Sequence, residues 1–126
     1  ETIKITFDSA IDPASIDSSW NGSSALTGKS VTGSADTDAL EIEGVGEVKF
    51  TDEVIINDVS LNAKYELSAD KKTLTITLTG ATDTSFAATS GITNYKATFV
   101  VADTLKNSDG AYFNAGDTII TGSSIK

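Results

Sequence analysis

Apolar and polar residues alternate along most of this chain, which is the pattern of β-strands that bury one face. The clearest run is Thr73–Thr79, in which Leu or Ile occupies every second position and Thr the others. Residues 3–7 and 95–101 alternate in the same way. Weaker runs cover residues 39–43, 47–50, 54–61, 64–67 and 117–121. We therefore predict an all-β, antiparallel β-sandwich of about eight short strands, and the one-sided alternation excludes a doubly wound parallel sheet.

The segments between these runs have the composition of turns and loops. Residues 68–72 are polar and join two alternating runs, so 64–67 and 73–79 are expected to form a hairpin. Segments 21–38 and 80–94 are rich in Gly, Ser, Thr and Asp, and we predict that both are loops.

Helical signal is confined to one place. Asp12 suits a helix N-cap and Pro13 the first helical position, so we expect one helical turn over residues 12–17. Ile11 and Ile16 stand where a hydrophobic staple would close that turn. The alternation also predicts the core, which comprises Ile3, Ile5, Phe7, Leu67, Leu74, Ile76, Leu78, Ala97, Phe99 and Val101.

Length and composition limit the function. The chain has 126 residues, enough for a single domain spanning residues 1–126. It contains no Cys, His, Met or Arg, which excludes Ser-His and Cys-His nucleophilic machinery, His/Cys zinc sites and disulfides. Its formal net charge of −9 argues against nucleic-acid binding, because no basic patch is available to the phosphates. We expect no enzymatic activity.

The chain contains no run of about 18 apolar residues, so no membrane insertion is expected. It begins at Glu1 without an initiator Met or a signal peptide. We therefore expect a domain excised from a longer multidomain protein that carries its targeting information upstream.

Three segments, in order along the chain, resemble the bacterial immunoglobulin-like domains of S-layer and surface-adhesin proteins. The first is the strand at residues 3–8 with the acidic-Pro turn at 10–16. The second is the hairpin at 67–76, and the third is the strand at 95–103 with the loop at 107–110. The resemblance implies an immunoglobulin-like antiparallel β-sandwich of seven to nine strands. Residues 21–62 depart from the family's pattern, which leaves the strand register there open.

The resemblance also implies a function. Such domains are non-catalytic structural, spacer or assembly modules of secreted or cell-surface bacterial proteins. The expected partners are neighbouring domains of the same chain and other copies in a surface lattice, and the expected location is extracellular, at the cell wall or cell surface. The Thr-rich strands and the negative charge agree with this independently, because they keep a crowded module soluble.

One loop has the residue types of a calcium site. Asp103, Asn107 and Asp109 offer hard oxygen ligands, and Gly110 permits a sharp turn, so Ca²⁺ is the cofactor to expect if any metal binds. The spacing is not that of an EF-hand. The alternative is an ordinary turn, in which Asn, Asp and Gly relieve backbone strain.

Exposed aromatic residues suggest a second class of function, a carbohydrate-binding module. Trp20 and Tyr112 are the candidate stacking platforms, since an aromatic ring can pack on the apolar face of a sugar. The alternative for Trp20 is that it packs at one end of the core.

Overall fold

A computed structural model describes residues 2–34, 39–50, 59–79, 97–113 and 118–122. Eight strands and one short 3₁₀ helix account for most of these residues. In chain order they are β1 (Thr2–Phe7), η1 (Pro13–Ser15), β2 (Leu26–Ser34), β3 (Ala39–Ile42), β4 (Gly46–Phe50), β5 (Val59–Leu67), β6 (Thr73–Thr79), β7 (Ala97–Val101) and β8 (Thr118–Gly122).

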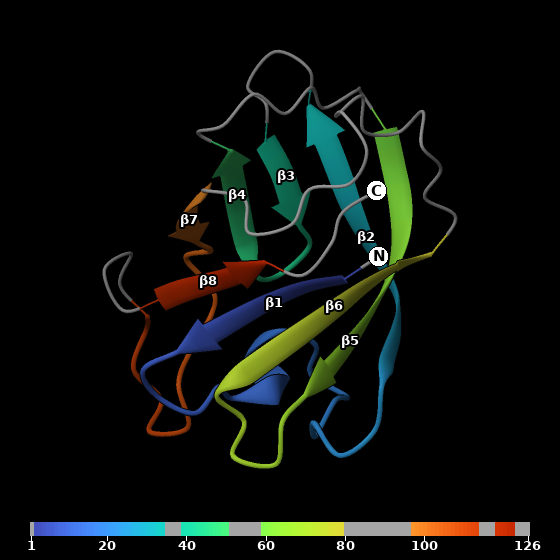
Figure 1. The fold of residues 1–126 in the computed structure, drawn as a ribbon. Helices are drawn as coiled ribbons and strands as arrows, with labels where there is room; N and C mark the ends of the chain where they lie inside the picture. Colours follow the sequence, from blue (N-terminus) through green and yellow to red (C-terminus); the bar gives the residue numbers. More distant parts are fainter. Residues whose placement is uncertain (1, 35–38, 51–58, 80–96, 114–117, 123–126) are drawn as a thin grey trace.

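The eight strands form one antiparallel sheet in the order β7-β4-β3-β2-β5-β6-β1-β8. Strands β2, β3 and β4 follow one another, and β5 returns to lie beside β2, which is the strand order of a Greek key. The sheet curls so that its two outermost strands, β7 and β8, come into contact (Figure 1). The all-β, antiparallel prediction is confirmed. The immunoglobulin-like sandwich is not, because the described strands form a single curled sheet instead of two separate ones.

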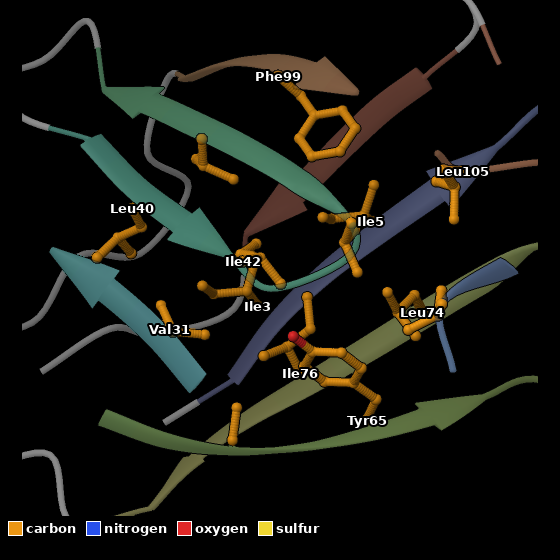
Figure 2. Close-up of a cluster of buried hydrophobic side chains, with 14 of the residues drawn as sticks. Ile3, Ile5, Val31, Leu40, Ile42, Tyr65, Leu74, Ile76, Phe99 and Leu105 are labelled. Atoms are coloured by element: carbon orange, nitrogen blue, oxygen red, sulfur yellow. The ribbon is translucent and has the colours of Figure 1, made fainter. Parts of the chain in front are cut away.

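Curling brings the inner faces of the two halves of the sheet together, and the core lies between them (Figure 2). The ring of Phe7 on β1 lies 6.1 Å from that of Phe99 on β7, so residues from opposite ends of the sheet meet. The alternation correctly identified the buried residues Ile3, Ile5, Phe7, Leu74, Ile76, Leu78 and Phe99. Leu67 and Val101 are partly buried against this core, and the side chain of Ala97 lies outside the described part.

The prediction of a loop at 21–38 is wrong over residues 26–34, which form β2. This strand is poor in apolar residues, and its pairing with β5 shifts register between Leu26 and Lys29, around the positive φ of Gly28. The bulge breaks the alternation that would have revealed the strand. β2 is stabilised from both sides by hydrogen bonds to β3 and β5. The predicted loop at 80–94 lies outside the described residues.

Two other local predictions are confirmed. β5 and β6 form the expected hairpin. The described part of the predicted run 54–61 and the run 64–67 belong to a single strand, β5. The predicted helical turn is η1: the carboxylate of Asp12 accepts a hydrogen bond from the backbone N–H of Ala14, and Pro13 opens the helix. Ile11 and Ile16 on either side are both buried.

Candidate functional site

The loops at one end of the sheet form a connected layer, which we call the loop end: residues 8–25, 68–72 and 102–113. They comprise the segment after β1, the turn of the β5–β6 hairpin and the segment after β7 (Figure 1). The backbone N–H of Ile11 donates to Lys71 O at 2.8 Å, and that of Asp12 donates to Lys106 O at 2.9 Å. Ser108 N–H donates to Ala10 O. Backbone hydrogen bonds between segments far apart in sequence therefore hold the loop end together.

Residues 102–113 are held in place from within as well. Leu105 and Phe113 are both buried, and Phe113 N–H donates to Leu105 O. The ring of Phe113 lies 4.9 Å from that of Phe7 in the core. Two buried anchors thus fix the position of the exposed residues between them.

The three expected calcium ligands, Asp103, Asn107 and Asp109, all lie in this segment. Asp103 and Asp109 are exposed. The side-chain oxygen of Asn107 accepts hydrogen bonds from the N–H groups of Asp109 and Ala111, each at 3.0 Å, which is the geometry of a turn. Within the described ranges no group of three or more acidic residues is arranged to hold a metal ion. Calcium binding stays a prediction.

Trp20 is not available as a stacking platform, because only 6% of it is exposed. Its Nε1–H donates to Ser24 O at 2.7 Å, and its ring belongs to the core cluster. Trp20 therefore packs against the core, which is the alternative interpretation of this residue.

Tyr112 has the opposite environment. It is 60% exposed, and the ammonium of Lys106 lies 4.9 Å from the centre of its ring, within cation–π distance. The two residues face each other across a short β-bridge. They border an open hollow of about 330 Å³, whose lining consists of Asp12, Ala14, Ser15, Thr104, Lys106 and Tyr112. The sequence suggested Tyr112 but not Asp12 or Lys106, which reach the hollow only through tertiary contacts.

A charged cluster that sequence reasoning missed joins the loop end to β2. The ammonium of Lys29 lies 3.1 Å from a carboxylate oxygen of Asp17 and 3.4 Å from one of Glu43. Hydrogen bonds from Ser19, together with Lys29, lower the pKa of Asp17 to about 2. Hydrogen bonds from Ser30, together with Lys29, lower the pKa of Glu43.

The same cluster is fixed to the core. The hydroxyl of the buried Tyr65 donates to Glu43 O at 2.7 Å, and burial raises the pKa of that phenol. Each of the three charged groups, Asp17, Lys29 and Glu43, thus has a partner within the cluster.

A second open hollow, of about 290 Å³, lies beside the β3–β4 turn and is lined by Glu41, Glu47 and Asp103 among others. Glu41 and Glu47 face each other across β3 and β4, and Lys49 lies 3.6 Å from Glu47. None of the described residues that line this hollow is aromatic, so they offer no stacking platform.

Comparisons with protein-family models, with curated proteins and with solved structures found no match for this chain. Among the described residues, no helix is both long and apolar enough to cross a membrane. Because no relative indicates a function, functional proposals for this chain rest on its fold and on the hollow at Tyr112.

Proposed function

We propose that this chain is a non-catalytic module of a secreted or cell-surface protein, which presents its loop end away from the neighbouring domains. One observation carries the proposal. The first and last strands are adjacent and antiparallel, with Ile3 opposite Gly122 and Phe7 opposite Thr118 (Figure 1). A chain that enters at the start of β1 and leaves at the end of β8 does so at the same end of the sheet.

This geometry favours one kind of module over another. A spacer in an extended stalk receives the chain at one end and releases it at the other. A domain whose ends are adjacent instead projects sideways from its parent chain. The loop end lies at the far side of β1, beyond Phe7, where it is free to meet a partner. Assembly or presentation is therefore favoured over simple spacing.

The surface chemistry supports an external location. The outward positions of β6 are Thr, and the chain carries 18 acidic residues against nine lysines. A net negative charge limits non-specific aggregation in a crowded setting. The resemblance to bacterial immunoglobulin-like surface domains points in the same direction, and its expected partners are neighbouring domains and further copies.

Energy transfer between two fluorescent proteins tests the orientation. In one fusion the first fluorescent protein precedes Glu1 and the second follows Lys126. In the matched control the second fluorescent protein is inserted between Asp70 and Lys71, at the loop end. We expect clearly higher transfer efficiency in the first fusion than in the control. Equal or lower efficiency in the first fusion, with resistance to limited proteolysis showing the domain to be folded in both, would reject lateral presentation.

A further inference from the structure

The ring of Tyr112 lies largely exposed at the loop end. Only two large hydrophobic residues are exposed in the described part of the chain, Val100 and Tyr112. Tyr112 directly precedes the buried Phe113 and pairs with Lys106, which directly follows the buried Leu105. The ring is thus an exposed aromatic surface on a backbone that is already ordered, so a ligand need not order the loop.

Polar groups surround this ring in the hollow. Lys106 has no carboxylate within salt-bridge distance among the described residues, so its ammonium can donate to a ligand. Asp12 uses Oδ1 to cap η1, and its Oδ2 has no hydrogen-bond partner in the described ranges. The hydroxyl of Thr104 likewise has no such partner there. The hollow therefore offers donors and acceptors beside an aromatic face.

The remaining polar side chain belongs to the framework. Ser15 Oγ donates to Asp12 O at 2.7 Å and accepts from Lys106 N–H at 3.0 Å. It therefore ties η1 to the strand-like segment that carries the ammonium. These two bonds hold the backbone of Lys106 beside that of Asp12, which is 94 positions away in sequence.

We propose that this hollow binds a neutral sugar, with a pyranose ring stacked on Tyr112 and its hydroxyls bonded to Lys106, Asp12 and Thr104. A pyranose combines an apolar C–H face with hydroxyls that both donate and accept hydrogen bonds. The hollow supplies an aromatic ring for the face, and donors and acceptors for the hydroxyls. The described lining holds one ammonium and one carboxylate, so its charges cancel, and the net charge of −9 of the whole chain repels a polyanion. The volume of about 330 Å³ suits one or two sugar units.

A shallow site of this size binds weakly. We expect a Kd on the order of 1 mM for a short oligosaccharide. Several copies of the module on one surface would raise the effective affinity through multivalency. This inference does not depend on the orientation of the termini, so it and the proposed function can fail separately.

Titration of the ¹⁵N-labelled domain, followed by NMR, tests the site. The probes are hexasaccharides of β-1,4-linked glucose, β-1,3-linked glucose, β-1,4-linked mannose and β-1,4-linked N-acetylglucosamine, with hexagalacturonate as the anionic comparison. At least one neutral probe is expected to shift the amide signals of Asp12, Ala14 and Ser15 and of residues 104–112. Absence of such shifts for every neutral probe at tens of millimolar, or tighter binding of hexagalacturonate, would overturn the proposal.

Variants then assign the binding to the ring. Tyr112→Ala is expected to weaken binding at least about tenfold, whereas Tyr112→Phe keeps the stacking face and most of the affinity. Lys106→Met removes the ammonium and is expected to weaken binding too. Val100→Ala, which changes the other exposed hydrophobic residue, is the matched control and is expected to bind normally. Undiminished binding by Tyr112→Ala would place the sugar elsewhere and reject the site.

Discussion

Truncation of Ile76 to Ala tests whether the curled sheet is held together by its inner face. The side chain of Ile76 is fully buried, and its strand places it opposite Ile3 on β1 and Tyr65 on β5. The substitution removes three carbon groups, each of which contributes about 0.8 kcal/mol when buried. Because neighbours on both sides are fixed by strand pairing, the cavity closes only in part and adds to this loss. We expect the free energy of unfolding to fall by about 3 kcal/mol, within the usual range of about 2–5.

Urea unfolding followed by the fluorescence of Trp20 measures this change. Trp20 is the only Trp in the chain and is buried, so its emission reports on the folded state. The midpoint should fall without a change in the m-value if only stability is altered. For a domain of this size the melting temperature should drop by roughly 10–15 °C.

Thr75→Ala is the matched control, because it lies next to Ile76 on the outward, half-buried face of β6. Its expected effect is about 1 kcal/mol or less. If Ile76→Ala lowered the free energy of unfolding by under about 1 kcal/mol, or no more than Thr75→Ala, the inner face would not be the core of the sheet and the reasoning would be refuted.

Two further predictions follow from the backbone and the charged cluster. Gly46 has a φ of 151°, and a Cβ there would collide with the backbone oxygen of Val100 on β7, so Gly46→Ala should lower the free energy of unfolding by about 1–3 kcal/mol. Gly28 also has a positive φ, but a Cβ there would meet open space, so Gly28→Ala should lower the free energy of unfolding less in urea melts. Equal losses in the two variants would contradict the proposed clash at Gly46. Asp17, with a folded pKa of about 2 against 3.8, stabilises the fold above pH 3.8 and loses this effect as the pH falls toward 2. The stability difference between wild type and Lys29→Met should therefore shrink between pH 6 and pH 2.5 in urea melts, and a constant difference would exclude the ion pair.

Local interactions account for the features that the sequence predicted correctly. The alternation over Thr73–Thr79 assigns each residue to a face, and the structure has a strand with those bounds. The cap at Asp12 and the polar hairpin at 68–72 depend on residues only a few positions apart. Such contacts are encoded by neighbouring side chains, so a single sequence suffices to predict them.

Tertiary structure decided the rest. Backbone hydrogen bonds between strands are chemically alike, so alternation shows which face of a strand is buried but not which strand lies beside it. Alternation therefore does not distinguish the one curled sheet from the expected two. β2 was missed because its bulge breaks the alternation, and its pairing with β3 and β5 is what stabilises it. The hollow at Tyr112 also exists only because of tertiary structure. Asp12 and Lys106 meet because the loop after β1 pairs with the loop after β7, and no local pattern records that pairing.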